Sequence, residues 1–353
     1  MSWKLFPAAD FGLYAARWQQ LNAERADSPL LRPDFVQALL TAFADGDQRL
    51  AVYERDGQVA ALALVTPRAS GKWETWQPSQ APVSLWVQRP SLDVPALLAE
   101  LIRALPGLPL VFGLTQRDPA LDARPLDAGH VRTMDYIATA HVVITGSFDD
   151  YWNARGKNLR SNLKKQRAKL AKDGVVTRLE VARAPYEMAA AVADYGRLES
   201  AGWKAQGGTA IHPDNAQGLF YRTMLESFAA RGAACVCRYW FGEQLVAMDF
   251  CIEGHDCLIV LKTTYDESVP NSLSPTLLMR EETTRALFDE ARFARLEFYG
   301  KVMDWHTKWT DEVRTMYHVT EYRWPVLLGL RQLIQQPLQL AGRLRTQLRG
   351  APR

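Results

Sequence analysis

A carboxylate in the middle of an apolar segment is the first feature of this sequence that could do chemistry. Asp249 stands in the run LVAMDFCIE, whose composition and length predict a buried strand. A carboxylate is costly in such surroundings unless it is paired or faces a cleft, and cleft carboxylates often bind substrate or accept protons. Asp249 is therefore either a base or substrate-binding residue, or the partner of a buried Arg or Lys.

A helix start at Ser274-Pro275 could hold an anion. Serine can cap a helix, and proline suits the first helical position because its missing N–H would be unpaired there anyway. After a strand, such a helix end offers free backbone N–H groups and the positive end of the helix dipole, which suit a pyrophosphate. An ordinary capped helix explains the same residues, so both interpretations stay open.

A third candidate is a basic segment, residues 155–172, which holds eight Lys and Arg residues. Lys157, Arg160, Lys164 and Arg167 recur at helical spacing and so share one face of a helix. The opposite strip is apolar and consists of Leu159, Leu163 and Leu170. The basic face is either a solvated helix surface or a docking surface for an anionic partner. It lacks the interleaved aromatic residues and the motifs of DNA readout, so we expect no DNA partner.

All four cysteines fall between Cys235 and Cys257, at a spacing that matches no common zinc module. Cys235 and Cys237 are expected to point to the same side of a strand. We expect small buried hydrophobic residues in a reducing compartment and no metal, with metal binding as the alternative.

A weak internal repeat supplies the elements that must position these residues. Shifting the chain by 186 positions, from Tyr53 to Tyr239, places AVYERDGQVAALAL (51–64) on CRYWFGEQLVAMDF (237–250). Both segments predict a strand, a polar turn and a second strand. Asp249 stands where the first copy has Ala63, so only the second copy carries a carboxylate in its hairpin.

The repeat extends backwards into a predicted helix in each copy. Residues 34–46 fall on 220–232, both are apolar at helical spacing, and each ends at a glycine, Gly46 or Gly232. Two unrelated helix–hairpin units are the alternative. A loop at 117–130 and a closing strand at 135–146 place the domain boundary after the first copy.

We therefore expect two halves, 1–146 and 147–324, and a tail, 325–353. In the second half the expected order is helix, helix, three antiparallel strands, helix, strand. After the basic helix, these elements are expected at Tyr186–Ser200, 218–230, Ala234–Trp240, Gln244–Glu253, Asp256–Thr264, a helix from Ser274, and Arg295–Tyr299.

This order, together with certain segments, resembles the CelD/BioF2-like acetyltransferases, a group of the GNAT superfamily related to the FemAB-type transferases. The segments are GKNLRSNLKKQRAKL, Trp203-Lys204, the hairpin 237–250, Ser274-Pro275-Thr276-Leu277-Leu278 and LEFYGKVMDWHTKW. The resemblance covers roughly residues 150–320 well and the first 150 weakly. Thr276 stands where the group commonly has glycine. The resemblance implies an α/β (α+β) fold of tandem GNAT-like halves, each a mixed, mostly antiparallel sheet flanked by helices, with a degenerate first half.

The resemblance also implies a direct transfer, in which an amine attacks a thioester. An ammonium of pKa near 10 must first lose a proton to a carboxylate, the oxyanion needs an N–H donor, and the leaving thiolate needs an acid. The expected catalytic residues are Asp249 or Glu297 as base and Tyr265 or Tyr299 as acid, with rim packing as the alternative for each tyrosine.

The implied donor is an acyl-CoA, with acetyl-CoA as the first choice and no metal. The residues expected to bind it are Ser274, Pro275, Thr276, Leu277 and Lys262. The residues expected to bind substrate are Trp203, Lys204, His306, Lys308, Arg160 and Lys164, although His306 beside two tryptophans also fits a structural role.

Composition places the chain among soluble globular proteins, with 48% hydrophobic and 23% charged residues. Formal net charge is only +3, so any anion binding must come from a local cluster. The N-terminus lacks a secretory signal, which predicts a cytoplasmic protein. The tail mixes Leu, Ile and Val with arginines, which fits either an amphipathic contact with an anionic membrane or a helix packed on the core.

The resulting hypothesis is a cytoplasmic GNAT-type N-acyltransferase that modifies an amine-bearing glycan or lipid in bacterial exopolysaccharide or cell-envelope biosynthesis. Three alternatives stay open. They are a sphingoid or lipid N-acyltransferase that uses a long-chain acyl-CoA, a non-catalytic partner of a glycan synthase complex, and a FemAB-like transferase that takes its acyl group from a charged tRNA.

Overall fold

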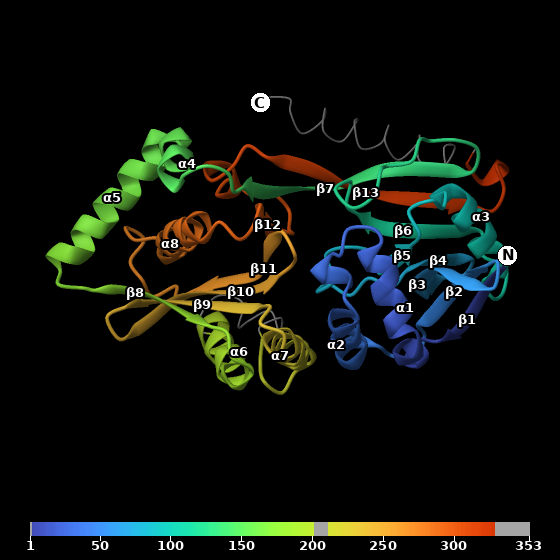
Figure 1. Cartoon of the computed structure of the whole chain (residues 1–353), viewed down its shortest axis with the longest axis horizontal. Helices are drawn as coiled ribbons and strands as arrows, with labels where there is room; N and C mark the ends of the chain where they lie inside the picture. The colour runs from blue at the N-terminus through green and yellow to red at the C-terminus, as the bar shows by residue number, and fades with distance from the viewer. Residues whose placement is uncertain (1, 201–210, 329–353) are drawn as a thin grey trace, which may run out of the picture.

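A strand, a helix pair and three antiparallel strands occur twice along the chain (Figure 1). The structure is a computed structural model that describes residues 2–200 and 211–328. The first copy comprises β1 (Ser2–Pro7), α1 (Phe11–Ala23), α2 (Pro33–Phe43), β2 (Arg49–Arg55), β3 (Gln58–Ala69), β4 (Lys72–Thr75), β5 (Trp86–Gln88), α3 (Val94–Ala104) and β6 (Val111–Arg117). Both predicted elements of the repeat, the helix and the hairpin, are present in it.

The second copy repeats the order of a strand, a helix pair, three antiparallel strands, a helix and a strand, without a counterpart of β5. After β7 (Val131–Val143) and the short helix α4 (Phe148–Ala154), it comprises α5 (Lys157–Lys172), β8 (Thr177–Ala182), α6 (Pro185–Ser200), α7 (Ala216–Ala229), β9 (Ala234–Phe241), β10 (Gln244–Glu253), β11 (Cys257–Tyr265), α8 (Pro275–Glu290), β12 (Arg295–Phe298), the 3-10 turn η4 (His306–Lys308) and β13 (Val313–Tyr322). The predicted order from α6 to β12 is confirmed, whereas α4, β8 and β13 were not predicted.

The strands form one mixed sheet, in the order β1-β2-β3-β4-β6-β13-β7-β12-β11-β10-β9-β8, with β5 added beside β3. Most neighbours are antiparallel. Parallel pairing occurs at β4–β6 and at β11–β12, the equivalent position of each copy. The expected fold class, tandem GNAT-like halves with mostly antiparallel sheets, is therefore confirmed.

The two halves exchange their last strands. β7 follows β6 in sequence but pairs with β12 of the second copy, whereas β13 follows β12 but pairs with β6 of the first. β7 and β13 also pair with each other along most of their length and cross the middle of Figure 1. The boundary expected after residue 146 remains a prediction, because a strand from each side of it pairs with strands of the other half.

Hairpin turns with left-handed residues set the register of both repeated hairpins. Asp56 and Gly57 have φ values of 54° and 73°, and Gly242 has 57°. Such values suit the primed turns that match the twist of antiparallel strands. The polar turn predicted in each hairpin is thus confirmed, at Asp56-Gly57 and at Gly242-Glu243.

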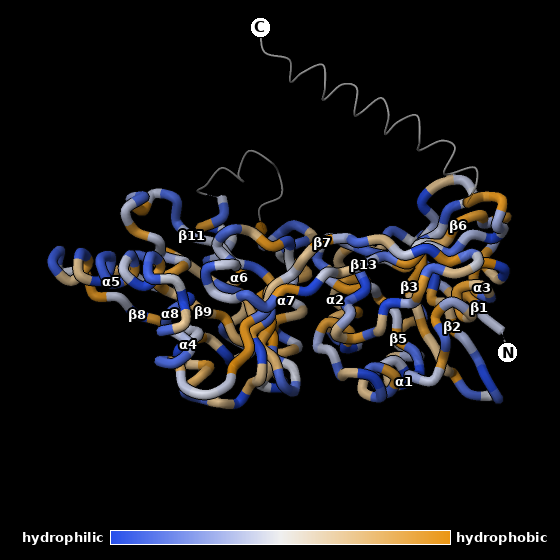
Figure 2. The backbone as a smooth tube through the Cα atoms, turned by 90° about the horizontal axis from the view of Figure 1, so that it is seen from above, coloured by the Kyte–Doolittle hydropathy of each residue, from blue (hydrophilic) through white to orange (hydrophobic). Residues whose placement is uncertain are grey.

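Helices cover both faces of the sheet. A core on one face joins α1 and α2 of the first half to α6 and α7 of the second, with edge-on contacts of Phe35 with Phe220 and Phe228. The opposite face is divided between a core under α4, α5 and α8 and a core under α3. In Figure 2 the hydrophobic segments gather between these layers.

A β-bulge in β11 changes which face its side chains meet. Phe250 of β10 pairs with Lys262, whereas Cys251 pairs with Val260, so Leu261 is an extra residue. A bulge of one residue reverses the alternation of the strand beyond it. Val260 therefore faces α8, Lys262 faces α6 and α7, and Thr263 faces α8 again.

None of the helices in the described ranges, 2–200 and 211–328, is long and apolar enough to span a bilayer. The expected amphipathic tail lies outside the described residues from 329 onward.

Candidate functional site

The start of α8 lies where two cavities meet. Ser274 precedes the helix and Pro275 is its first residue, as predicted. The Ser274 hydroxyl makes no capping bond, however. Its carbonyl accepts the N–H groups of Leu277 and Leu278, and its own N–H donates to Gln166 Oε1 of α5 at 2.8 Å. The helix end is thus fixed from α5, without using the hydroxyl.

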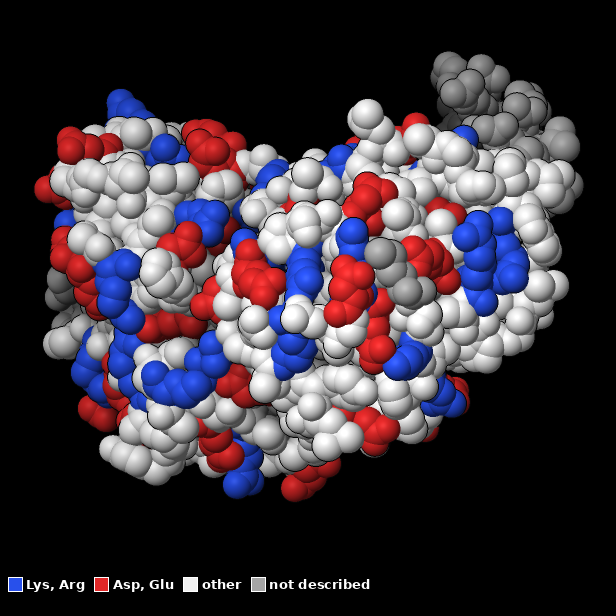
Figure 3. Space-filling view, turned by 45° about the vertical axis from the view of Figure 1, so that its right-hand side comes forward, with Lys and Arg blue, Asp and Glu red and all other residues white. Residues whose placement is uncertain are grey.

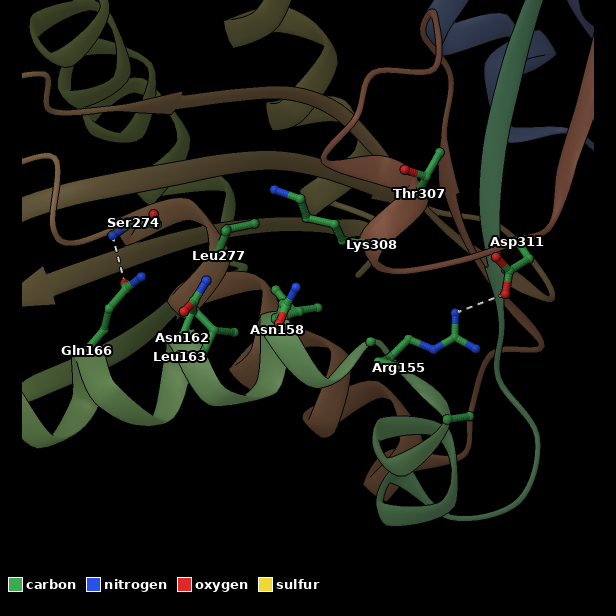
Figure 4. Close-up of a pocket in the computed structure, with 13 residues that line it drawn as sticks. Arg155, Asn158, Asn162, Leu163, Gln166, Ser274, Leu277, Thr307, Lys308 and Asp311 are labelled. Carbon is green, nitrogen blue, oxygen red and sulfur yellow. Dashed lines mark hydrogen bonds and ion pairs between the residues drawn. The ribbon is translucent and has the colours of Figure 1, made fainter.

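The first cavity, the α5–α8 cleft, has a volume of about 680 Å³ and a polar lining. Asn158, Asn162 and Gln166 recur every four residues on one face of α5 and point across the cleft toward α8 (Figure 4). The remaining lining is Ala154, Arg155, Gly156, Leu159, Leu163, Ser274, Leu277, Thr307, Lys308 and Asp311. The cleft therefore combines amides, two cations and a helix N-terminus, a set that suits phosphate oxygens.

One of the two cations is more available than the other. Arg155 Nη1 lies 3.6 Å from Asp311 Oδ2 and 3.0 Å from the Trp309 carbonyl oxygen, whereas exposed Lys308 extends toward Ser274 (Figure 4). Lys308 was predicted to bind substrate or donor phosphates. The structure brings it to the same cleft as Ser274 and Leu277.

The second cavity, the α8–β11 pocket, has a volume of about 550 Å³. It is lined by Thr263, Tyr265, Asn271, Leu273, Ser274, Pro275, Thr276, Leu277, Arg280 and Trp305. Ser274 and Leu277 line both cavities, so together they form an L-shaped space around the start of α8. Four predicted donor residues and Tyr265 are brought together here.

Beside this pocket, β11 and β12 separate. They pair in parallel only from Cys257–Arg295 to Ile259–Glu297, after which β11 continues to Tyr265 beside β10. A parallel pair that opens toward its carboxyl ends leaves room at the sheet edge for a ligand arm. The second cavity lies at this opening.

Asp249 is fully buried and paired. Its Oδ2 lies 2.6 Å from Arg280 Nη2, and its Oδ1 accepts the Thr263 hydroxyl at 2.5 Å. Burial raises the pKa of Asp249 above its ordinary value, although Arg280 and Thr263 oppose the shift. Of the two interpretations drawn from the sequence, pairing with a buried arginine is the one that the contacts favour.

Glu297 and Tyr299 lie on the other face of the sheet. Glu297 Oε2 lies 2.9 Å from Arg314 Nη1, and the Tyr299 hydroxyl donates to Asp118 Oδ2 at 2.6 Å. Burial raises the pKa of Glu297, and it raises that of Tyr299 well above its ordinary value. The two candidate carboxylates, Asp249 and Glu297, are therefore separated by the sheet.

A third cavity, the inter-half pocket, opens beside Glu297 and Tyr299 with a volume of about 370 Å³. Its other walls come from 26–29 and 120–121 of the first half and from 255–257, Ile259 and Arg295 of the second. Asp118 and Arg314, which hold the two residues in place, lie in the loop after β6 and in β13. The strand exchange is what brings these groups together.

Lys262 does not reach either cavity at α8. Its ammonium lies 3.1 Å from Glu199 Oε2 and over the rings of Tyr195 and Tyr221, on the α6–α7 face. The bulge at Leu261 is the physical reason, since simple alternation from Val260 would have placed Lys262 on the α8 face.

The basic face of α5 is confirmed as one surface. Lys157, Arg160, Lys164 and Arg167 line a shallow fourth cavity of about 530 Å³, on the opposite flank of α5 from the α5–α8 cleft. Arg167 is neutralised by Glu281 and Glu282, each at 2.8 Å, and Arg160 donates to the Arg155 carbonyl. Lys157 and Lys164 are exposed. On the face of the molecule shown in Figure 3, positive and negative side chains are interspersed.

His306 has a structural environment. Its ring stacks on Trp305 with centroids 3.6 Å apart, and its Nδ1 accepts the Met303 N–H at 2.9 Å. Burial lowers the pKa of His306 to about 4. Trp203 and Lys204, the other predicted substrate residues, lie outside the described residues.

The cysteines are free and buried, and the Sγ atoms of Cys235 and Cys237 lie 3.8 Å apart on one side of β9, as predicted. Over residues 2–200 and 211–328, no His, Cys, Asp and Glu side chains form a group of three or more that could hold a metal ion.

Sequence reasoning missed several lining residues. The amides Asn158, Asn162 and Gln166 had a detectable signal, because their spacing of four marks a polar stripe between the basic and apolar faces of α5. Arg280 had none, because a lone arginine within a helix does not show which way it points.

Comparisons with known proteins agree with this geometry. Residues 157–307 match the model of the acetyltransferase (GNAT) domain. Among solved structures, the chain is similar to a C-terminal domain assigned to lysylphosphatidylglycerol synthetase of Agrobacterium fabrum (15% identity, 88% of this chain and 92% of that chain, TM-score 0.55). It is also similar to FemX (12%, 91% and 98%, 0.53) and to L-PGS from Bacillus licheniformis (13%, 87% and 91%, 0.51). No curated protein matches the sequence.

The structural matches have low identity and show the fold alone. The family match spans α5 to the start of η4 and so includes the whole lining of the α8–β11 pocket. It includes most of the lining of the α5–α8 cleft, but not Arg155 or Lys308. Residues 157–307 of the second half are therefore similar to a GNAT acetyltransferase domain, and the predicted enzyme class, an acyltransferase, is confirmed.

Proposed function

We propose that the protein transfers an acyl group from an acyl-CoA, with acetyl-CoA as the first choice, to the amine of a cell-envelope precursor. The observation that carries the proposal is the junction of a polar cleft and an apolar-walled pocket at Ser274 and Leu277. An acyl-CoA has the same division, with phosphates at one end and a thin arm ending in a thioester at the other.

In this proposal the α5–α8 cleft receives the phosphates. Lys308 and Arg155 supply positive charge, and the N-terminus of α8 supplies backbone N–H groups and the positive end of its dipole. The arm then passes Leu277 into the α8–β11 pocket, where Leu273, Pro275 and Trp305 exclude water from the thioester.

The acceptor enters from the inter-half pocket and reaches the thioester through the opening between β11 and β12. Glu297, the last residue of β12 that pairs with β11, lies beside this opening and receives the proton of the amine. The amine nitrogen bonds to the thioester carbon, the C–S bond breaks, and the thiolate takes a proton from the hydroxyl of Tyr265, which lines the α8–β11 pocket and regains its proton from solvent. Burial raises the pKa of both carboxyls, but Glu297 lines the inter-half pocket, whereas Asp249 lines none of the cavities described above and is engaged by Arg280 and Thr263. Glu297→Gln should lower kcat at least about 100-fold with little change in donor affinity. An unchanged kcat would exclude Glu297 as the base.

The envelope assignment rests on resemblance. Residues 150–320 resemble the CelD/BioF2-like group, which is associated with surface polysaccharide precursors. The fold of the chain is also similar to the folds of FemX and L-PGS. A glycan or lipid amine is therefore the acceptor class that we propose.

A second candidate donor is an aminoacyl-tRNA, which the basic face of α5 favours. Exposed Lys157 and Lys164 flank the same helix that forms the α5–α8 cleft, so a polyanion could contact both sides of α5. Lys157→Glu/Lys164→Glu separates the donors. It should abolish transfer from tRNA, and it should leave transfer from acetyl-CoA within twofold of wild type.

Native mass spectrometry of the purified protein, followed by isothermal titration, tests the proposal. The expected result is a copurified mass that matches CoA or an acyl-CoA, and one equivalent of acetyl-CoA bound with micromolar affinity, in the usual range of enzyme substrates. If neither acetyl-CoA nor a longer acyl-CoA binds, the proposed donor is wrong.

A further inference from the structure

Arg280 places a guanidinium at the floor of the α8–β11 pocket. The residue is only 3% exposed, yet it lines the pocket together with Thr263 and Trp305. Its guanidinium lies 5.1 Å from the ring centre of Phe298. A side chain with five N–H donors and a permanent charge thus stands at the end of a pocket whose other walls are mainly apolar.

The guanidinium is held before any ligand arrives. Asp249 of β10 binds its Nη2 at 2.6 Å, and Thr263 of β11 holds the other oxygen of Asp249 at 2.5 Å. Asp249 therefore anchors one nitrogen of a guanidinium that has five N–H donors. A donor fixed in this way needs no reorganisation when charge develops on a substrate.

The position of Arg280 along α8 matches the arm of the proposed donor. Arg280 follows Thr276 by four residues, so both lie on the same face of the helix, with Arg280 about 6 Å further along the axis. Both residues line the pocket. A ligand arm that enters at Ser274 and follows this face reaches the guanidinium.

The local charge favours a carbonyl over a carboxylate as the group that Arg280 meets. Arg280 and Asp249 form a pair without net charge, both at most 3% exposed. A bound carboxylate would leave one uncompensated negative charge in this buried site, which is strongly unfavourable. A neutral carbonyl adds no charge, and the oxyanion that forms from it during transfer is stabilised by the adjacent cation.

We infer that Arg280 donates hydrogen bonds to the reacting carbonyl oxygen of the acyl donor, and that Asp249 and Thr263 are its positioning residues. This inference rests on the proposed function. When the amine bonds to the carbonyl carbon, the C=O electron pair moves to oxygen and is stabilised by Arg280. The electron pair on oxygen re-forms the C=O bond when the C–S bond breaks, and sulfur leaves with the electron pair of the C–S bond. Arg280 stays protonated throughout.

The experiment removes the guanidinium without leaving a buried charge. Arg280→Met/Asp249→Leu replaces the pair with apolar side chains, which buried pairs often tolerate. Arg238→Met is the matched control, because Arg238 is also buried but lies on β9 against Glu180 and Asp194 and lines neither cavity at α8. The readouts are kcat, the KM for acetyl-CoA, and the infrared stretching band of a ¹³C-labelled thioester carbonyl.

The double variant should lose about 100-fold or more in kcat with KM within threefold, as expected when a single oxyanion donor is removed. The carbonyl band of bound acetyl-CoA should shift to lower frequency in wild type and Arg238→Met and return toward its free value in the double variant. Arg280→Lys should restore part of the shift.

Two results together would overturn the inference and leave the proposed function standing. They are a folded double variant with kcat within threefold of wild type, and a carbonyl band of bound acetyl-CoA at the same frequency in the double variant as in wild type. A raised KM with unchanged kcat would also overturn it, since the pair would then only shape the pocket. If the wild-type protein binds no acyl-CoA, the proposed function and the inference fail together.

Discussion

Gln166 of α5 accepts the backbone N–H of Ser274, at 2.8 Å, immediately before α8 begins. This bond joins the two helices that form the α5–α8 cleft, and it places a side-chain amide beside the helix N-terminus (Figure 4). The charge at position 166 should therefore control anion binding at α8 without controlling the fold.

Gln166→Glu keeps an acceptor for the Ser274 N–H and adds a negative charge to the cleft. The carboxylate should leave the melting temperature unchanged or slightly raised, because it lies near a helix N-terminus. It should weaken the binding of acetyl-CoA about tenfold at low salt, and less at high salt, because it repels the phosphates. Gln37→Glu, the same change on the exposed surface of α2, is the control for isothermal titration. Tighter binding by Gln166→Glu would show that phosphates do not lie here.

Lys308→Ala tests the phosphate contact separately from the arm. The variant should bind acetyl-CoA about tenfold more weakly, which corresponds to ~1.4 kcal/mol. It should bind acetylpantetheine, which lacks the phosphates, as well as wild type does. Exposed Lys301, which lines neither cavity at α8, provides the matched control Lys301→Ala. Equal weakening for both ligands would place Lys308 away from the phosphates.

The Asp249–Arg280 pair should show strong coupling in stability. Asp249→Leu or Arg280→Met alone leaves a buried charge without its partner and should lower the free energy of unfolding by ~3–5 kcal/mol. The double variant should lie within about 1 kcal/mol of wild type. Urea denaturation of the four proteins measures the coupling. Additive losses in the double variant would mean that the two side chains do not compensate each other.

Glu321 should make stability fall as pH rises. Its side chain is 2% exposed, and Oε2 has no hydrogen-bond partner within the described part of the chain. Burial raises the pKa of Glu321 to about 7, above the ordinary 4.5. The folded state thus binds more protons than the unfolded state between these values. Stability from this group is fully present below pH 4.5 and is lost as pH rises through 7, by as much as ~3 kcal/mol.

The matched variant Glu321→Gln isolates that contribution. The difference in unfolding free energy between wild type and Glu321→Gln should change in favour of the variant from pH 5 to pH 8, measured by urea denaturation. Histidines with lowered pKa, such as His306, have the opposite pH dependence, but they contribute equally to both proteins. A difference that is constant with pH would show that Glu321 titrates normally.

Local patterns in the sequence predicted the elements well because the repeated units are locally encoded. The turn Asp56-Gly57, the apolar strip of α5 and the proline at the start of α8 each act within a few residues. The exchange of β7 and β13 is different, since β13 pairs with β6 across about 200 residues. No periodicity in either strand specifies that partner.

The candidate site was predicted only where side-chain direction follows from regular alternation or from the helix start. Ser274, expected to bind the donor, and Lys308, expected to bind substrate, line one cleft. A single extra residue at Leu261 turns Lys262 to the opposite face of the sheet, and no sequence pattern indicates this bulge. The pairing of Asp249 with Arg280 depends on how α8 packs over β10, and the local spacing of residues does not predict this tertiary packing.

Isothermal titration of acetyl-CoA into wild type and Leu277→Trp tests the central proposal most directly. Leu277 lines both cavities at the start of α8, so an indole there would close the passage between them. Wild type should bind one equivalent with micromolar affinity, and folded Leu277→Trp should bind at least about 100-fold more weakly. Equal affinity of the two proteins, or no binding by wild type, would contradict a donor site at α8.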